Sequence, residues 1–462
     1  MSSGAPGRRM AGAVLVALVG VGSGLAWPVP QARPDRRPNV IVVLTDDQRA
    51  DTLDAMPWLG KELARRDSGW VSFPNAFANT PLCCPARASL LTGRYARHTG
   101  VEDNADGAKL DESSTLATRF HAVGYRTGLF GKYLNHYPFG RLPYVPAGWD
   151  RFVAKRNQSG ETTYRDFHAV EQGSQVFVRE YATDWLSEKA VGFVRTAPSR
   201  RPFFLLFTPS APHPPWIPAQ RHRGAYAELP VEEPPSVRGA LRGAPPWVRS
   251  LPAANAAQRT AWLEGRLRAD ETLLAVDEAL QAIVEALGDR LDETVIFVLS
   301  DNGYSFGEHR WEGKKCPYDE CVRIPLAVHS PSADGGELPA IVSIVDLAPT
   351  ILSVAGVASP GDFDGQRFAA WIEPSIDTLL EPRNEIVFLE WAGDEQIPPW
   401  TAVRTADLKL IRYGDGFEEL YDIGGIVGSP DPWEMANVVD DPRYAGALAR
   451  LRALLGRAFV PR

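Results

Sequence analysis

Four short apolar runs in this chain each lead, within a few residues, to polar side chains that could carry chemistry. The runs and the residues that follow them are 40–44 with Asp46 and Asp47, the run ending at Phe130 with Lys132, 203–207 with His213, and 294–299 with Asp301 and Asn302. Continuous apolar and β-branched runs of this length are typical of strands buried on both faces, as in a largely parallel sheet. Ligands bind such sheets beyond the carboxyl ends of the strands, so the pattern predicts an α/β fold with a functional site at that edge.

Helical patterns lie between and after these runs. From Leu267 to Leu287, apolar residues recur at helical spacing, and Gly288 closes the pattern. Residues 341–357 predict a strand followed by a helix, whereas the proline-rich segment 214–252 has no sustained period and predicts a long loop near the site. After about residue 375, short apolar stretches predict antiparallel strands, followed by a terminal helix. We therefore expect a large, mixed, mostly parallel sheet flanked by helices, with a small C-terminal α+β subdomain.

This organisation divides the chain into three parts. We expect an export signal with a short linker at 1–37, a catalytic α/β domain at 38–375 and the C-terminal subdomain at 376–462. In the first part, Arg8 and Arg9 precede an apolar stretch that ends near Ala26, which predicts a cleaved signal rather than an uncleaved anchor. The mature protein is then expected to be exported (secreted, periplasmic or at the cell surface), with no stable membrane span.

Charge and cysteine content exclude some classes of protein. The net charge of the 462 residues is −8, and no block of Lys and Arg stands out in the mature part, so nucleic acid is not an expected partner. Four cysteines are too few for a disulfide scaffold. Cys316 and Cys321 could pair with each other, or one of them could pair with Cys84, and the sequence leaves both pairings open.

The two acidic pairs predict a metal site. Asp46, Asp47, Asp301 and Asn302 would form an anionic, all-oxygen nest if their strands are neighbours, which suits Ca²⁺ or Mg²⁺. Such pairs also occur as ordinary loop and helix-cap residues, but their matched placement after two strands favours the metal site. A two-zinc phosphatase needs histidine ligands, and none lies within these pairs.

The stretch "CCPAR" places two cysteines side by side at positions 83 and 84. Adjacent cysteines can hardly bridge each other, so a structural disulfide between them is not expected. Pro85 suits the first turn of a helix that runs to Thr92 and ends at Gly93. Cys83 then lies at the helix N-terminus, where backbone N–H groups favour anions. The alternative for this motif taken alone is a buried structural thiol.

The longer segment "CCPARASLLTGR" resembles the sulfatase signature, Cys-x-Pro-x-Arg with a Thr-Gly-Arg tail. "NVIVVLTDDQ", "GYRTGLFGKY", "SDNGYSFGEH", "GKKCPYDECVRIPL", "DLAPTIL" and "ELYD" also resemble landmarks of that family, in the same order. The resemblance implies an alkaline-phosphatase-like fold. It also implies that a maturation enzyme converts Cys83 to formylglycine, which in its hydrated form attacks sulfur and gives a covalent sulfo-enzyme intermediate.

The resemblance also implies a role for each remaining polar residue. Ca²⁺, with Mg²⁺ as the alternative, is held by Asp46, Asp47, Asp301, Asn302 and the converted Cys83. Lys132 and Lys314 bind the sulfate group, and Arg87 holds the gem-diol and the neighbouring carboxylates. His213 protonates the leaving oxygen. Two further histidines are candidates: His309 matches a frequent family histidine, and His136 could replace the histidine that many relatives have at the position of Leu134.

The function expected from these residues is hydrolysis of a carbohydrate or aryl sulfate monoester to an alcohol and inorganic sulfate. One alternative keeps the formylglycine but acts on a phosphonate monoester or a phosphodiester. A second alternative is a non-catalytic scaffold that binds an anion or a glycan. Such a scaffold is expected to have lost Cys83, a lysine or an acidic ligand, and all of these residues are present.

Overall fold

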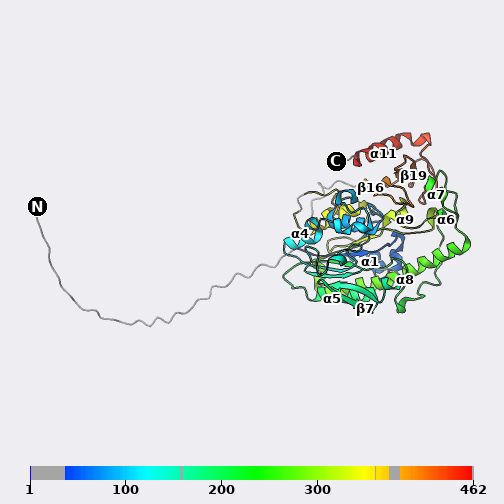
Figure 1. Cartoon of the computed structure of the whole chain (residues 1–462). Helices are drawn as coiled ribbons and strands as arrows, with labels where there is room; N and C mark the ends of the chain where they lie inside the picture. Colours follow the sequence, from blue (N-terminus) through cyan, green and yellow to red (C-terminus); the bar gives the residue numbers. More distant parts are fainter. Residues whose placement is uncertain (2–36, 157–159, 231, 359–360, 374–384, 460–462) are drawn as a thin grey trace. The chain divides into compact units, whose positions relative to one another are not determined.

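The apolar runs form neighbouring parallel strands at the centre of one sheet (Figure 1). The computed structural model describes residues 1, 37–156, 160–230, 232–358, 361–373 and 385–459. Within these residues ten strands form the main sheet. Its five central parallel strands are, in spatial order, β9 (Thr294–Ser300), β1 (Asn39–Thr45), β8 (Phe203–Thr208), β4 (Arg126–Gly131) and β5 (Arg151–Lys155). The predicted α/β fold class and the four predicted strands are confirmed.

Shorter strands extend both edges of this sheet. Because most of them run antiparallel to their neighbours, the sheet is mixed, as predicted. On the β9 side these strands are β13 (Leu326–His329), β2 (Trp70–Ser72) and β14 (Gly336–Glu337), and on the β5 side they are β6 (Phe167–Glu171) and β7 (Ser174–Val178). Two small sheets lie beside it: β3 (Asn75–Phe77) with β12 (Arg323–Ile324) and β15 (Ile341–Ser343), and the hairpin of β10 (Ser305–Phe306) with β11 (Glu312–Gly313).

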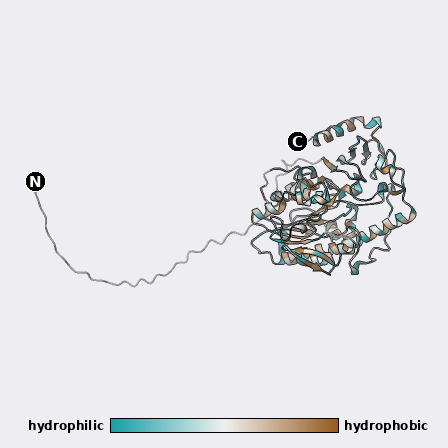
Figure 2. Cartoon of the chain, in the orientation of Figure 1, coloured by the Kyte–Doolittle hydropathy of each residue, from teal (hydrophilic) through white to brown (hydrophobic). Residues whose placement is uncertain are grey.

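Helices cover both faces of the central strands, which explains why hydrophobic residues predominate in these strands (Figure 2). One face packs against α2 (Cys83–Thr92), α4 (Leu116–Ala122) and α10 (Ile344–Val354). The other face packs against α1 (Pro57–Ala64), α5 (Ala182–Arg195) and α8 (Ala256–Leu287). No described helix combines the length and apolar character required to cross a bilayer.

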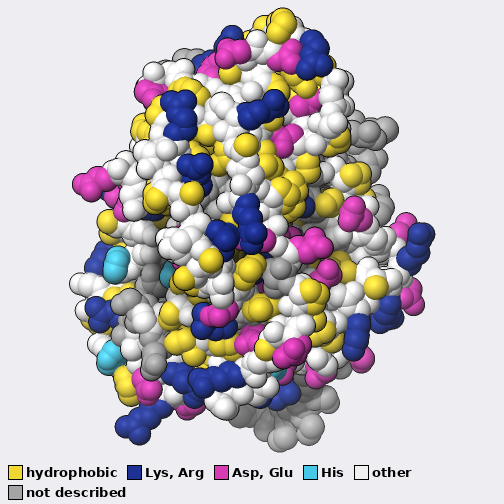
Figure 3. All heavy atoms as spheres, turned by 90° about the vertical axis from the view of Figure 1, so that its right-hand side faces the viewer, with side chains coloured by type: hydrophobic (Ala, Val, Ile, Leu, Met, Phe, Trp, Pro, Cys, Tyr) yellow, Lys and Arg dark blue, Asp and Glu magenta, His cyan; other side chains and the backbone are white. Residues whose placement is uncertain are grey.

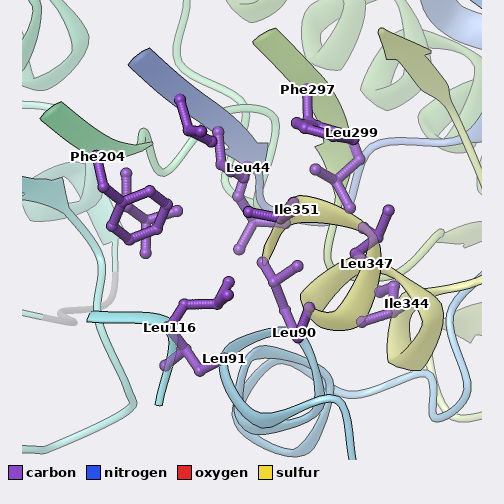
Figure 4. Close-up of a cluster of buried hydrophobic side chains, with 14 of the residues drawn as sticks. Leu44, Leu90, Leu91, Leu116, Phe204, Phe297, Leu299, Ile344, Leu347 and Ile351 are labelled. Atoms are coloured by element: carbon purple, nitrogen blue, oxygen red, sulfur yellow. The ribbon is translucent and has the colours of Figure 1, made fainter. Parts of the chain in front are cut away.

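The core beneath α2 fixes the position of that helix relative to the strand ends. Figure 4 shows Leu90 of α2 and Ile351 of α10 meeting Leu44 and Leu299 of the sheet. These side chains are at most 2% exposed. Truncating a buried leucine or isoleucine to alanine typically costs about 2–5 kcal/mol, so this cluster holds α2 firmly.

Two sequence predictions differ from the structure in detail. Helix α8 begins at Ala256 rather than Leu267, because the Asn255 side chain accepts from the Gln258 N–H and Gln258 bonds back to Asn255, a capping box that starts the helix before its apolar period begins. The described part of 214–252 is mostly loop, as predicted. It contains three short helices, η6 (Gln220–His222), α6 (Pro235–Arg238) and α7 (Pro246–Ser250).

The C-terminal region forms a separate antiparallel sheet, as predicted. Its strands follow chain order: β16 (Ile386–Trp391), β17 (Trp400–Thr405), β18 (Leu408–Tyr413) and β19 (Glu418–Asp422). The predicted terminal helix is α11 (Ala445–Ala458), which packs on one face of this sheet. The opposite face contacts the α/β part of the chain around Leu82 and Tyr318. The expected domain boundary at 375–376 and most of the expected export segment lie outside the described residues.

Charged side chains are interspersed on the face shown in Figure 3. Lys and Arg alternate there with Asp and Glu over short distances. This mixture agrees with a chain in which 49 basic residues are set against 57 acidic ones.

Candidate active site

The register of β1 and β9 brings the two acidic pairs together. Thr45 lies opposite Ser300, and the ladder continues one step further through the N–H of Asp301, which donates to the carbonyl of Thr45 at 3.2 Å. The N–H of Asp47 donates to Oδ1 of Asp301 at 3.1 Å. The predicted juxtaposition of these residues is therefore present in the structure.

Asn302 adds an amide to this acidic group. Its Nδ2 donates to Oδ1 of Asp47 at 2.6 Å and to the carbonyl of Gly303 at 2.8 Å. Its Oδ1 is buried without a hydrogen-bond partner among the described residues. A buried acceptor without a donor is costly, so this oxygen is suited to a cation, as are the carboxylates beside it. Oxygen atoms of Asp46, Asp47 and Asp301 lie within 4.8 Å of one another.

Helix α2 presents Cys83 to the acidic group. The helix begins at Cys83 and ends at Thr92, and it is followed by Gly93, whose φ of +70° is a left-handed conformation suited to glycine. A Cβ at Gly93 would lie 2.5 Å from the ring of Phe363, so a larger residue would clash there. Sγ of Cys83 lies 3.5 Å from Oδ1 of Asp46. The sequence predicted this placement at a helix N-terminus.

The neighbouring Cys84 points elsewhere. Its thiol is buried in the hydrophobic cluster under α2, and its N–H donates to Oδ1 of Asn104 at 3.0 Å. A disulfide joins Cys316 to Cys321, so Cys83 and Cys84 are both free thiols. Of the pairings that the sequence left open, the structure contains the local one.

Three basic side chains neutralise the carboxylates. Lys132 Nζ lies 2.7 Å from Oδ2 of Asp46, and Arg87 Nε lies 2.8 Å from Oδ2 of Asp301. Lys314 Nζ reaches both Asp47, at 2.7 Å, and Sγ of Cys83, at 2.8 Å. These contacts place the two predicted lysines and Arg87 at the acidic group.

Arg87 also connects two parts of the site. Its Nη1 donates to the carbonyl of Lys132 at 2.8 Å, so one guanidinium fixes the end of β4 as well as Asp301. Its Nη2 is buried without a hydrogen-bond partner among the described residues and lies 3.8 Å from Oδ2 of Asp46. Arginine suits this position because its planar group serves several acceptors at once.

His213 faces the same group from the loop after β8. Its Nε2 lies 3.7 Å from Oδ2 of Asp47. Its Nδ1 lies 2.7 Å from the carbonyl of Pro214, which can only accept, so Nδ1 carries a proton and donates it. Burial lowers the pKa of His213, although Asp47 and Asp46 oppose this effect.

Burial and the nearby positive charges shift the pKa values of the acidic groups in opposite directions. Burial alone would raise the pKa of Asp46, but the charges of Lys132, His213, Arg87 and Lys314 lower it. Burial raises the pKa of Asp301 to about 6, against the effect of Arg87. Burial also raises the pKa of the Cys83 thiol to about 12. Strongly shifted groups that gather at strand ends are typical of functional sites.

The other two candidate histidines, His309 and His136, have no hydrogen bond or ion pair to the described residues of this cluster. His309 is buried, with Nδ1 at 2.8 Å from Oε1 of Glu320 and Nε2 at 3.0 Å from the carbonyl of Glu434. Because acceptors engage both ring nitrogens, the imidazole is held by these residues, and no hydrogen bond or ion pair joins it to the described residues of the acidic group. His136 is exposed at a turn with φ of +60°, and no hydrogen bond or ion pair joins it to the described residues of the cluster.

Two features of this site were not predicted from the sequence. Lys155 ends β5 next to Lys132, the residue that follows the neighbouring strand β4. Lys155 is 2% exposed, and burial lowers its pKa to about 7. The run "RFVAK", an apolar stretch ending in a charged residue, repeats the pattern of the other strand ends and could have revealed it. Arg49 forms a buried ion pair with Glu308 at 2.8 Å, which joins the segment after Asp47 to the hairpin before Lys314. Because Arg49 and Glu308 are far apart in the sequence, no local sequence pattern predicts their ion pair.

Comparison with known families agrees with this geometry. Residues 38–357 match the family model described as sulfatase. Residues 307–459 match a second family model, described as the C-terminal region of N-sulphoglucosamine sulphohydrolase. Together the two matches cover most of the described residues.

Individual proteins give the same result. The chain is 28% identical to an N-acetylglucosamine-6-O-sulfatase from Bacteroides thetaiotaomicron, over 92% of this chain and 87% of that protein. A solved structure of a protein in complex with its substrate, D-glucosamine-2-N,6-O-disulfate, superposes with a TM-score of 0.77 at 26% identity, covering 91% of this chain and 97% of the other. The phosphonate monoester hydrolase of Agrobacterium radiobacter shares the fold, with a TM-score of 0.71 at 21% identity over 91% of this chain and 96% of the other.

Proposed function

This chain belongs to the sulfatase family and hydrolyses sulfate esters, and we propose that its substrate is a glucosamine unit sulfated at O6, free or within a glycan. Two relatives support this substrate: one is an N-acetylglucosamine-6-O-sulfatase, and the other was solved with a glucosamine disulfate. The observation that carries the proposal is the convergence of Cys83, two lysines and the acidic group at the strand ends, in a chain similar to these proteins over more than nine-tenths of its length.

We propose that a Ca²⁺ ion is held by Asp46, Asp47, Asp301 and Asn302, with the converted Cys83 beside it. The unpartnered Oδ1 of Asn302 and the close carboxylates fit an ion that prefers oxygen ligands. A bound divalent cation at this position would polarise the sulfate oxygens as a Lewis acid. Mg²⁺ is the alternative, since it also accepts oxygen ligands.

We propose that a maturation enzyme converts Cys83 to formylglycine. The match of "CCPARASLLTGR" to the family signature supports this conversion. A hydrated aldehyde at this position would supply an oxygen nucleophile for sulfur. Lys314 and Asp46, which contact Sγ of Cys83, are placed to orient that oxygen.

The chain's other residues divide the remaining tasks. Lys132 and Lys314 neutralise charge on the sulfate group, and Arg87 holds Asp301 and the end of β4 in position. His213 holds a proton on Nδ1 and turns Nε2 toward the cluster, so a proton taken up at Nε2 can pass to the leaving oxygen. We also propose that the protein is exported, on the basis of the signal-like residues 8–26.

A substrate comparison tests this function. Enzyme produced with the maturation enzyme is incubated with N-acetylglucosamine-6-sulfate, 4-nitrophenyl sulfate, an aryl phosphonate monoester and an aryl phosphodiester, and the released sulfate or alcohol is measured. We expect the highest kcat/KM on the sugar sulfate and none of this activity in Cys83→Ala. Preference for the phosphonate or phosphodiester would support the alternative hydrolase, and sole activity on the aryl sulfate would contradict the glucosamine substrate.

A further inference from the structure

His213 differs from Asp46, Asp301 and Lys132 because it does not come directly after a strand of the main sheet. Strand β8 ends at Thr208, and His213 lies in the loop beyond it. A side chain on a loop keeps an accurate position only if other groups fix the loop. The backbone of this loop is tied to the site at Ala211, whose carbonyl accepts from the N–H of Asp46 at 3.2 Å.

Two stacked tyrosines donate hydrogen bonds to the backbone of the same loop. Tyr164 is fully buried, and its hydroxyl donates to the carbonyl of His213 at 2.6 Å. Tyr181 lies against Tyr164, with ring centroids 5.8 Å apart, and its hydroxyl donates to the carbonyl of Ile217 at 3.0 Å. Each tyrosine therefore anchors a different residue of one loop, and of the two only Tyr164 bonds to His213, whose N–H also donates to the carbonyl of Ser210 at 2.9 Å.

Hydrogen bonds fix the ring of His213 relative to its own backbone, and that backbone relative to Tyr164. Its Nδ1 donates to the carbonyl of Pro214, the next residue, so the ring is fixed relative to the local backbone. That backbone is fixed in turn by Tyr164 at the carbonyl of His213. Nε2 then faces Oδ2 of Asp47 at 3.7 Å. The chain of contacts runs from the Tyr164 hydroxyl to the nitrogen that faces the cluster.

We propose that Tyr164 is a positioning residue for proton transfer: its hydroxyl holds the His213 backbone so that Nε2 is aimed at the leaving oxygen. This inference rests on the proposed function, in which His213 is the proton donor. Tyr164 itself donates to a backbone carbonyl and transfers no proton. Its effect is expected to be largest for substrates whose leaving oxygen requires a proton.

The test removes one hydroxyl from each tyrosine. Tyr164→Phe keeps the ring and its stacking on Tyr181, so the fold is expected to persist, and a thermal unfolding midpoint measured for each variant checks this. Tyr181→Phe is the matched control, because it removes a hydroxyl that holds the same loop away from His213. Two substrates are compared. In N-acetylglucosamine-6-sulfate the leaving group is a sugar alkoxide, which is poor unless it is protonated, whereas the 4-nitrophenolate that leaves from 4-nitrophenyl sulfate needs little protonation.

We expect Tyr164→Phe to lower kcat on the sugar sulfate about 10- to 100-fold, the range for a small misplacement of a reacting group, with KM nearly unchanged. On 4-nitrophenyl sulfate the loss is expected to stay within about 2-fold, and Tyr181→Phe is expected to stay within about 2-fold on both substrates. The double variant Tyr164→Phe/His213→Ala is expected to be no slower on the sugar sulfate than His213→Ala alone. This last comparison requires only one substrate.

Several outcomes would overturn the proposal. Equal losses on both substrates, equal losses in the two tyrosine variants, or additive losses in the double variant would mean that Tyr164 acts on general loop structure. A His213→Ala enzyme without leaving-group dependence would overturn the role of His213 and this proposal together. If His213→Ala shows that dependence and Tyr164→Phe does not, only the role of Tyr164 fails.

Discussion

Nζ of Lys314 lies 2.8 Å from Sγ of Cys83, although the two residues are 231 positions apart in the chain. The lysine follows the short hairpin of β10 and β11, whereas the cysteine begins α2. The same ammonium group contacts Oδ1 of Asp47 at 2.7 Å. One side chain thus joins the proposed nucleophile position to the proposed metal ligands. This lysine contacts the thiol of Cys83, whereas the thiol of the neighbouring Cys84 lies in the hydrophobic core.

The first prediction concerns the two cysteines. We expect the peptide that contains Cys83 to carry the mass deficit of a thiol converted to an aldehyde, when the protein is made with a maturation enzyme and examined by peptide mass spectrometry. Cys83→Ala is expected to abolish sulfate release. Cys84→Ala is the matched control: its thiol packs in the core, so we expect activity to persist with a stability loss of at most about 2 kcal/mol.

An unmodified Cys83 in enzyme that releases sulfate would contradict the formylglycine mechanism. An unmodified Cys83 in inactive protein made with the maturation enzyme would instead favour the non-catalytic binding scaffold. Loss of activity in Cys84→Ala with normal conversion of Cys83 would contradict the purely structural role of Cys84.

The second prediction concerns the divalent cation. We expect a chelator to abolish activity and to lower the thermal unfolding midpoint, because the close carboxylates then lose their counter-ion. Added Ca²⁺ is expected to restore both, and Mg²⁺ to do so poorly. Asn302→Ala removes the unpartnered Oδ1 and is expected to weaken Ca²⁺ binding about 10- to 100-fold by calorimetry. Equal restoration by Mg²⁺ would contradict the choice of Ca²⁺, and no response to any divalent ion would contradict the site.

The sequence predicted the parts of this molecule that follow from local pattern. Buried strands require continuous apolar runs, so the runs before Asp46 and Asp301 identified two neighbouring strands and the site at their ends. Proline in the first turn and glycine after the last turn bounded α2 for the same local reasons. When such strands are parallel neighbours, their carboxyl ends share one edge of the sheet, so the polar residues that follow them lie close together.

The remaining features depend on contacts between distant segments. Nothing near Glu308 signals its ion pair with Arg49, and nothing near Tyr164 signals its bond to His213. His309 shows the same dependence: a family landmark made it a candidate site residue, and in the structure its ring nitrogens contact Glu320 and Glu434. Such roles depend on contacts between segments that are distant in the sequence, and the spacing of residues along the chain does not predict these contacts.

The third prediction concerns the disulfide between Cys316 and Cys321. This short loop begins two residues after Lys314, and the carbonyl of Cys321 accepts from the N–H of Gly303, next to Asn302. We expect the double variant Cys316→Ser/Cys321→Ser to lose about 2 kcal/mol of stability, from the loop-closure entropy of a short loop, with a further fall in kcat. Thermal unfolding and kinetics, each with and without reductant, measure these effects. Reductant is expected to leave the double variant unchanged, and an equal response in both proteins would contradict the assignment to this disulfide.

The last prediction concerns stability against pH. Burial would lower the pKa of His309, but Glu320 and Glu434 raise it from 6.5 to about 9. A raised pKa means that the folded state holds this proton more tightly than the unfolded state does, so the stabilisation is complete below about pH 6.5 and is lost as the pH rises through 9. At about 1.4 kcal/mol for each pH unit, the expected loss is on the order of 3 kcal/mol.

Unfolding in denaturant at a series of pH values between 6 and 10 measures this loss, with His309→Gln as the matched variant. Glutamine can still donate to Glu320 or to the carbonyl of Glu434, but it does not titrate. We expect the free energy of unfolding of the native protein to fall toward that of His309→Gln as the pH rises, so that the difference between the two is large at pH 6 and small at pH 10. A difference that stays constant across this range would mean that the ring stabilises the fold through packing on Tyr318 rather than through its charge.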